Sequence, residues 1–442
     1  MTAAQGLGSN FVMREANRTD MSDPSAPDRA VTADRSAGTG AAAVPSEREL
    51  TEWITTRAAE LQPGLVAVRR DLHAHPELGR EEVRTTEVIA EQLRRLGLQP
   101  SVLRVGTGLT CDIVPDFVDP DAGLLGLRAD IDALPLTETT GLPFASTNTG
   151  VAHSCGHDVH TTILLGVAQL LTELRDQGKL ARGVRLIFQP AEESSPGGAI
   201  DVVGDNRMLG VDEVYALHCD PGVDVGQIGL RTGPITSAAD KVTIEVHGPG
   251  GHTSRPQLSA DLIGGLADLA NRLPLLLSRR VDPRGTASLV WGVIEAGHAN
   301  NAIPEAGSLK GTLRCLDPAT WRAARTALPG LAKEVAAPWG ELEVQVFLSG
   351  DIPPTVNHPA GVTRLTRAGQ AVLGWEAMVD TPQSLGGEDF GVLLSHAPGA
   401  MARLGVRSVG GHDWPDLHRP DFMADEGAIE VGVHFLTAAA AL

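Results

Sequence analysis

The spacing of apolar residues predicts alternating helices and short strands, beginning near Ser46. Apolar positions three and four residues apart indicate amphipathic helices, whereas short β-branched or aromatic runs indicate strands. The predicted helices in the first half are 47–61, 65–72, 81–96 and a strongly apolar, buried one at 161–171. The predicted strands are 109–114, 123–128, 184–188 and 213–217.

The pattern changes at Ser237. Strand 242–247, helix 261–277, strands 286–294 and 308–315, helix 318–336 and strand 342–348 follow one another. This β-α-β-β-α-β order is that of a split βαβ unit. The glycine- and proline-rich stretches 233–234 and 350–354 resemble hinge linkers on either side of it. We therefore expect residues 237–350 to form an inserted domain between two parts of a first domain, 47–236 and 351–442. The second part closes with a helix over 426–442.

Composition narrows the possible partners and compartments. Residues 1–46 lack a periodic apolar pattern, so we expect a disordered tail, and they do not have the pattern of a secretory signal. A net charge of -19 argues against nucleic acid and anionic membranes as partners. No apolar run is long enough to cross a bilayer. The 4 cysteines are scattered, which is typical of a reducing compartment, and we expect a cytoplasmic protein.

The richest candidate for chemistry is the stretch VAHSCGHDVH at 151–160. If its first half is extended, His153, Cys155 and His157 share one face, and Asp158 caps the helix that follows. A thiolate and imidazoles on one face suit a borderline-soft cation such as zinc. The alternative is a polar turn with a buried free cysteine, but the density of ligand-type side chains favours metal.

Further polar side chains follow the predicted strands. Asp130 and Asp132 follow the second strand, where they can bind metal or orient a histidine. Glu192 and Glu193 follow the third, and because adjacent side chains diverge, one can bind metal while the other faces substrate. His218 follows the fourth. His73 and His75 are as readily packing histidines as ligands. Glycine-rich segments precede His252 and open a predicted helix at Gly386-Gly387, whose amides would favour an anion.

These motifs together resemble the amidohydrolase branch of the metal-dependent aminoacylase and carboxypeptidase family, which includes hippurate hydrolases and auxin-conjugate hydrolases. The resemblance runs from about residue 65 to 425. It is carried by RRDLHAHPELG, LRADIDALPL, HSCGHDVHTT, FQPAEE, the strand before His218, GGHTS, GGEDF and DLHRPDF. The chain departs from the family at Gln257, where the branch often has a histidine, and at Asp130, where the wider family has one.

The resemblance implies an α/β fold: a catalytic domain with a mixed sheet and helices on both faces, and an inserted α+β satellite domain of split βαβ type. It implies two divalent ions, zinc, manganese, cobalt or nickel, held by Cys155, His157, Glu193, His218 and His418. Glu192 would be the general base and His252 would reach the substrate carbonyl. Asn301, Arg314, Gly386 and Gly387 would bind the substrate, with its carboxylate held by Arg314, by Asn301 or by the amides of the two glycines.

The implied activity is hydrolysis of the amide bond of N-acyl amino acids, by a homodimer joined through the satellite domain. Two alternatives stay open. One is a dipeptidase or carboxypeptidase of the same family. The other is a non-catalytic metal-dependent binding module, against which the presence of Glu192 argues.

Overall fold

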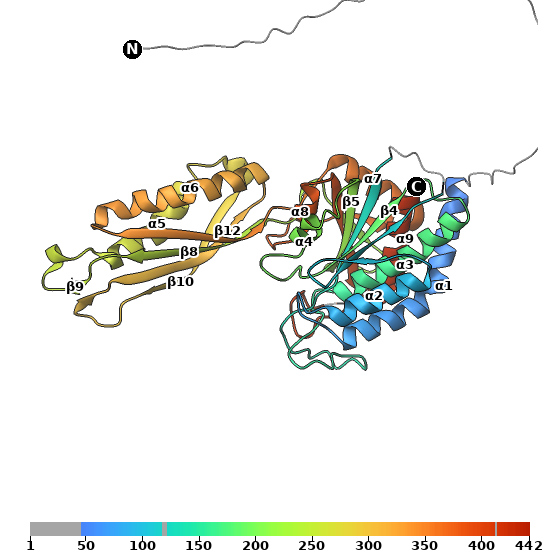
Figure 1. Cartoon of the computed structure of the whole chain (residues 1–442), viewed down its shortest axis with the longest axis horizontal. Helices are drawn as coiled ribbons and strands as arrows, with labels where there is room; N and C mark the ends of the chain where they lie inside the picture. Colours follow the sequence, from blue (N-terminus) through green and yellow to red (C-terminus); the bar gives the residue numbers. More distant parts are fainter. Residues whose placement is uncertain (1–45, 117–121, 412) are drawn as a thin grey trace, which may run out of the picture. The chain divides into compact units, whose positions relative to one another are not determined.

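The computed structural model describes residues 46–116, 122–411 and 413–442, and its largest sheet is mixed (Figure 1). Eight strands follow the order β1-β2-β4-β3-β5-β16-β6-β15. The central pairs β4–β3, β3–β5 and β5–β16 are parallel, and β1–β2, β2–β4 and β16–β6 are antiparallel. The strands are β1 (Ser101–Val102), β2 (Leu109–Ile113), β3 (Leu124–Asp130), β4 (Val184–Gln189), β5 (Val211–Asp224), β6 (Ile228–Leu230), β15 (Met378–Asp380) and β16 (Gly399–Arg407).

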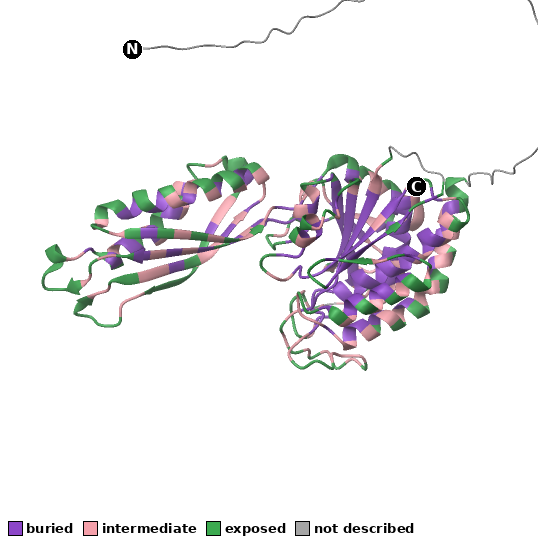
Figure 2. Cartoon of the chain, in the orientation of Figure 1, coloured by how far each residue is buried: buried purple, intermediate pink, exposed green. Residues whose placement is uncertain are grey.

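Helices cover both faces of this sheet. One face packs on α1 (Glu47–Ala74), α2 (Val83–Arg95), α3 (His157–Asp176), α7 (Pro359–Leu373) and α9 (Gly427–Ala441). The other packs on the short helices α4 (Ala199–Gly204) and α8 (Phe390–Leu394). Helix α3 lies between the sheet and helices α1 and α9, so nearly all of its residues are buried (Figure 2). This explains why its sequence is apolar on all sides.

A second, four-stranded antiparallel sheet has its own hydrophobic core. Its strand order is β10-β12-β8-β13. The elements follow the chain as β8 (Ala238–His247), α5 (Leu262–Leu277), β10 (Ala287–Ala296), β12 (Ala306–Cys315), α6 (Pro318–Ala336) and β13 (Glu343–Ile352). Alternate residues of β8, Val242, Ile244 and Val246, are buried in this core with leucines of α5 and α6.

Two short strand pairs and several turns of 3₁₀ helix lie outside the two larger sheets. Strand β9 (Gly251–His252) pairs with β11 (Ala302–Ile303), and β7 (Gly233–Pro234) pairs with β14 (Val356–Asn357), where the chain leaves and returns to the large sheet. Turns of 3₁₀ helix lie at Pro256–Leu258, Pro283–Gly285, Ala337–Trp339 and Trp375–Ala377. Among the described helices, none combines the length and apolar character needed to span a bilayer.

Two sequence-based element predictions are wrong. The segments 47–61 and 65–72 form one helix, α1, which continues through Pro63. Buried residues on both sides of the proline, such as Ile54 and Leu72, anchor this helix in the core, and that packing outweighs the lost hydrogen bond. The helix predicted to open at Gly386 begins only at Phe390 and is five residues long.

Candidate metal centre

The start of α3 places the first ligand-type side chains. Gly156 precedes the helix with φ 84°, a left-handed conformation that favours glycine, and the helix begins at His157. The condition under which the three side chains would share one face, an extended segment before the helix, is therefore not met, and the assignment of Asp158 as the N-cap is wrong. Asp158 lies inside the first turn, where its Oδ2 accepts hydrogen bonds from Arg69 at 2.7 Å and from His73 at 2.8 Å.

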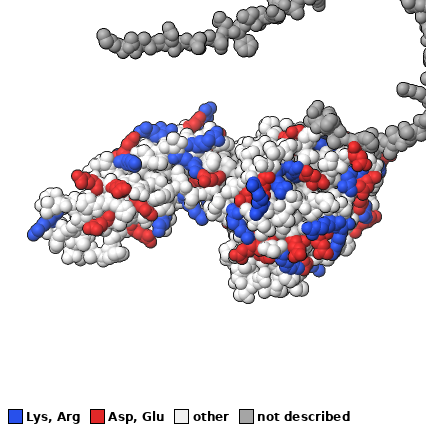
Figure 3. All heavy atoms as spheres, in the orientation of Figure 1, with Lys and Arg blue, Asp and Glu red and all other residues white. Residues whose placement is uncertain are grey.

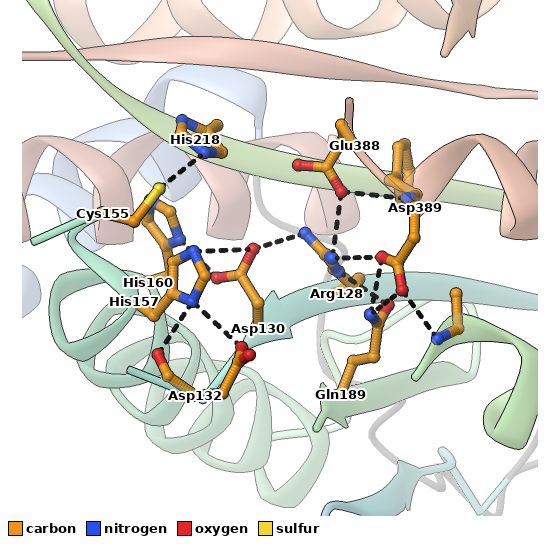
Figure 4. Close-up of polar contacts among 12 residues, drawn as sticks. Arg128, Asp130, Asp132, Cys155, His157, His160, Gln189, His218, Glu388 and Asp389 are labelled. Carbon is orange, nitrogen blue, oxygen red and sulfur yellow. Dashed lines mark hydrogen bonds and ion pairs between the residues drawn. The ribbon is translucent and has the colours of Figure 1, made fainter. Parts of the chain in front are cut away.

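Hydrogen bonds leave the Nε2 atoms of two histidines available as ligands. His157 Nδ1 donates to the backbone oxygen of Asp132 at 2.9 Å, and its buried Nε2 has no hydrogen-bond partner among the described residues. Carboxylate oxygens of Asp130 and Glu193 lie 3.7 Å and 4.0 Å from this Nε2. His218 Nδ1 donates to the backbone oxygen of Cys219 at 2.8 Å. Its Nε2 lies 3.5 Å from the Sγ of Cys155 (Figure 4). A fixed Nδ1 proton with a free Nε2 is the usual state of a metal-binding histidine.

A second group of possible ligands shares Cys155. His418 Nε2 lies 3.1 Å from Glu193 Oε1, and these two residues form a compact set with Cys155. Cys155, His157 and His218 form another, with the ligand atoms of each set within 4.8 Å of one another. Two adjoining sets of sulfur, imidazole and carboxylate donors fit two divalent cations of the zinc type.

The other histidines of the motif have different surroundings. His160 Nε2 accepts the Cys219 N–H at 2.8 Å, so its proton sits on Nδ1 and is donated to Asp130 Oδ1 at 2.5 Å. His160 lies close to His157 and Asp130, yet both of its nitrogens are occupied. His153 is buried away from these sets, and burial lowers its pKa to about 3. His73 pairs with Asp158, and His75 hydrogen-bonds the backbone oxygen of Asp71.

Asp132 connects the ligand His157 to the loop that carries the two glutamates. Besides accepting from His157, its carboxylate accepts the backbone N–H of Glu193 at 2.9 Å. It therefore orients a histidine, one of the two roles expected from the sequence.

Glu192 is buried beside a group of charges that sequence reasoning missed. Its carboxylate lies close to those of Glu388 and Asp389. Arg128 is fully buried among these acids, with ion pairs to Asp389 at 3.0 Å, Glu388 at 3.1 Å and Asp130 at 2.6 Å (Figure 4). Glu388 Oε2 is buried without a hydrogen-bond partner among the described residues. Two features of the sequence could have indicated this charged group: an arginine inside a predicted buried strand, and the two adjacent acids of the GGEDF motif.

Burial and neighbouring charges shift the pKa values of the cluster. Burial alone would lower the pKa of His157, but Asp130 and Asp132 raise it to about 10. Burial and the nearby glutamates raise the pKa of the Cys155 thiol. Burial, followed by the charges of Glu388 and Glu193, raises the pKa of Glu192. Burial and then Arg403 lower the pKa of His218. Without a metal, His157 and Cys155 therefore both hold protons at neutral pH.

Other residues predicted for the site belong to different surroundings. His252 lies in β9, exposed, with its Nδ1 accepting the Ser254 N–H at 3.1 Å, and Asn301 precedes the paired strand β11. Arg314, in β12, donates to the backbone oxygen of Leu385. All three lie between the start of β8 and the end of β13, residues 238–352, a segment called the four-stranded body below. They are absent from the ligand sets found in the described part of the chain.

The amides of Gly386 and Gly387 do not form a helix N-terminus, which corrects the sequence-based expectation. Gly386 donates its N–H to Ser384 Oγ at 3.0 Å and accepts from the Ser237 N–H at 3.2 Å. Both glycines precede α8, whose first residue is Phe390, because Glu388 and Asp389 turn into the interior to meet Arg128.

Comparisons with known proteins agree on one family. The model of peptidase family M20/M25/M40 matches residues 126–441. An N-acetyl-L-cysteine deacetylase of Bacillus subtilis (strain 168) is 39% identical over 378 residues, 85% of this chain and 87% of that protein. A Rhodococcus jostii (strain RHA1) protein, named as a glutamate–cysteine ligase, is 45% identical over 384 residues. That match covers 87% of this chain and 47% of the relative, so the chain spans about half of its length.

A solved structure supports the same relationship. The B. subtilis YXEP protein, described as a dinuclear metal binding peptidase from the M20 family, superposes with a TM-score of 0.74 at 31% identity. The superposition covers 87% of this chain and 98% of that one.

Proposed function

Because this chain belongs to peptidase family M20/M25/M40, we propose that it hydrolyses the amide bond of N-acyl amino acids, releasing a carboxylic acid and a free amino acid. The observation that carries the proposal is the cluster formed by the ligand atoms of His157, His218 and Cys155, with the buried carboxylate of Glu192 close to His157. The name of the B. subtilis deacetylase supports an N-acetyl amino acid as substrate, with N-acetylcysteine as the first compound to test.

Cys155, His157, Glu193, His218 and His418 would hold two divalent ions. When bound, such ions activate water and polarise the amide carbonyl. The chemistry of the donors supports this assignment, because thiolate, imidazole and carboxylate together suit zinc, manganese, cobalt or nickel. Asp132 would keep His157 in the tautomer that presents Nε2.

Glu192 would move the proton. Its raised pKa suits a group that accepts a proton from the attacking water and then donates it to the leaving amine. Glu193, one residue later, approaches His418 and would act as a ligand instead. Two chemically equal side chains thus take different roles because they meet different neighbours.

The four-stranded body would be the satellite domain of split βαβ type, with boundaries near 237 and 350. Its separate core supports this division, as do the paired strands β7 and β14 at the two chain crossings. We propose that closure brings His252 to the substrate carbonyl and Asn301 and Arg314 to the substrate. Gly386 and Gly387 would contribute to substrate binding from the loop that Arg314 already contacts.

The edge strand β10 supports a homodimer through this domain. Among the described strands, β10 pairs with β12 alone, and Val290 and Ile294 on it are exposed. Apolar side chains on an open edge favour pairing with a second copy. We expect a dimer by light scattering at micromolar concentration, and Val290→Lys should shift it toward monomer. A wild-type monomer under these conditions would contradict the assignment.

A substrate panel tests the reaction itself. The protein is assayed on N-acetyl and N-benzoyl amino acids and on dipeptides, with zinc, manganese, cobalt or nickel added. We expect turnover of the N-acyl amino acids. A preference for dipeptides would favour the peptidase alternative, in keeping with the description of the YXEP protein. Absence of turnover with every amide and metal would favour a binding module.

Substitution of the adjacent glutamates separates proton transfer from metal binding. Glu192→Gln should keep its metal and bind N-acyl amino acid, while kcat falls by at least about a hundredfold, because general acid–base catalysis contributes ~10²–10⁴-fold. Glu193→Gln should lose metal. Near-normal turnover by Glu192→Gln would refute the mechanism.

A further inference from the structure

Arg403, in β16, is a largely buried arginine whose side chain has no protein partner among the described residues. Only 7% of the residue is exposed, and its guanidinium makes no hydrogen bond or ion pair with any other residue that the structure describes. Two other arginines are buried still more deeply, with 1% exposed, and each meets carboxylates: Arg69 pairs with Asp158, and Arg128 with three acids. Because guanidinium stays charged and buried charges are normally paired, the missing partner of Arg403 points to a ligand.

The sheet register places Arg403 beside the candidate metal centre. Strands β16 and β5 are parallel, and Arg403 is the register partner of His218. Residues in register on neighbouring strands about 4.8 Å apart project to the same face of a sheet. On the other side, Arg403 is in register with Gly229 of β6, which has no side chain to crowd it. A Cβ at Gly229 would lie 3.2 Å from the Cβ of Arg403.

The position of Arg403 beside His218 also bears on the charge of the site. Divalent ions bound by His218 and its neighbours would add positive charge beside the guanidinium. Such a site favours an anionic ligand group.

We propose that Arg403 binds the carboxylate of the amino acid half of the substrate and so determines specificity for N-acyl amino acids over neutral amides. The inference rests on the proposed function. The substrate carboxylate and the scissile nitrogen are attached to the same α-carbon, so a group that holds one lies near the other. Guanidinium matches a carboxylate through two parallel hydrogen bonds, which fixes orientation as well as charge.

Matched acid and amide substrates test this assignment. N-acetylmethionine and N-acetylmethioninamide share the scissile bond and differ in the carboxylate. Arg403→Met removes the charge and keeps an unbranched side chain. We expect its kcat/KM on the acid to fall at least about 100-fold, mainly through KM, with less than about a threefold change on the amide. Arg403→Lys should keep part of the preference for the acid.

Two further variants serve as comparisons. Arg407→Met, on the same strand, removes an arginine that already pairs with Asp224 at 2.6 Å, and it should leave both substrates unaffected. Arg314→Met tests the rival holder of the carboxylate. Metal content and thermal melting should be unchanged in Arg403→Met. Equal losses on acid and amide, or loss of the acid preference only in Arg314→Met, would overturn the proposal.

A binding measurement separates this inference from the proposed function. Calorimetry with N-acetylmethionine is carried out on the metal-loaded wild type and on Arg403→Met. If Arg403→Met binds more weakly than the wild type and the wild type shows no turnover, the proposed hydrolysis is refuted, while the assignment of Arg403 to the carboxylate stands. Equal binding by both proteins would overturn the carboxylate site even if the wild type is an active hydrolase.

Discussion

At the scale of single residues, the sequence predicts which kinds of metal-binding side chain come together. The structure shows which of their atoms have no hydrogen-bond partner. Cys155, His157 and His218 come together as the motifs indicated. His153 does not join them, because the segment that carries it turns instead of running as a strand. The arginine in a buried strand and the adjacent acids of GGEDF were visible in the sequence. Their meeting was not, since residues 128, 388 and 389 come together only in the folded sheet.

Metal uptake should release protons from the cluster. His157 has a pKa of about 10 in the metal-free protein, and the pKa of Cys155 is raised, so both are protonated at pH 7 and a cation must displace those protons. We expect acid release when zinc is added to dialysed protein in weak buffer, followed with an indicator dye, and tighter binding as pH rises. Cys155→Ser should release less acid and lose its metal on dialysis. Full metal retention and activity in that variant would remove the cysteine from the ligand set.

At the scale of elements, strand and helix positions follow the apolar pattern wherever packing agrees with it. Helix α6 has the predicted bounds, and α5 begins one residue later, after its cap Asp261. The pattern fails where backbone geometry decides the outcome. Gly156 ends the preceding turn in a left-handed conformation, so α3 starts at His157, a boundary that alternation of side chains could not reveal.

Gly156→Ala should therefore damage both stability and metal binding. A left-handed backbone costs an L-residue roughly 1–2 kcal/mol. The added Cβ would also lie 2.7 Å from the Sγ of Cys219, which forces a shift between Cys155 and His157. Urea unfolding should show the lost stability and metal analysis the lost ions. Gly150→Ala is the matched control, because Gly150 has φ 85° and open space around its Cβ position. Equal effects in both variants would mean that backbone strain alone matters.

At the scale of the whole molecule, the sequence predicts two bodies and the order of their elements, but not which strands become neighbours. Strand β16 lies between β5 and β6, although the entire four-stranded body separates it from them in the chain. Acidic and basic side chains are interspersed on the face shown in Figure 3, despite the net charge of -19. The described residues of this face present no continuous basic patch.

Deletion of residues 1–45 should leave activity and melting temperature unchanged. This segment lies outside the described residues. Its sequence has no periodic pattern of apolar residues that could pack on a hydrophobic core. The deletion keeps Ser46, whose side chain and that of Glu49 cap α1 reciprocally. A deletion to residue 49 is the comparison, since it removes that cap and should lower the melting temperature. A clear loss of activity or stability in the shorter deletion would contradict the prediction.

The place of β16 in the sheet has a consequence for biosynthesis. As the chain leaves the ribosome, β5 emerges early, but its partner Gly399–Arg407 is made only after all of the four-stranded body. During that interval β5 presents an open edge flanked by apolar residues, the kind of surface on which nascent chains associate wrongly. The intervening body can fold meanwhile around its own core. The yield of this enzyme should therefore depend on translation speed and chaperone supply, because both change how long β5 stays unpaired before β16 is made. Neither changes the stability of the finished fold.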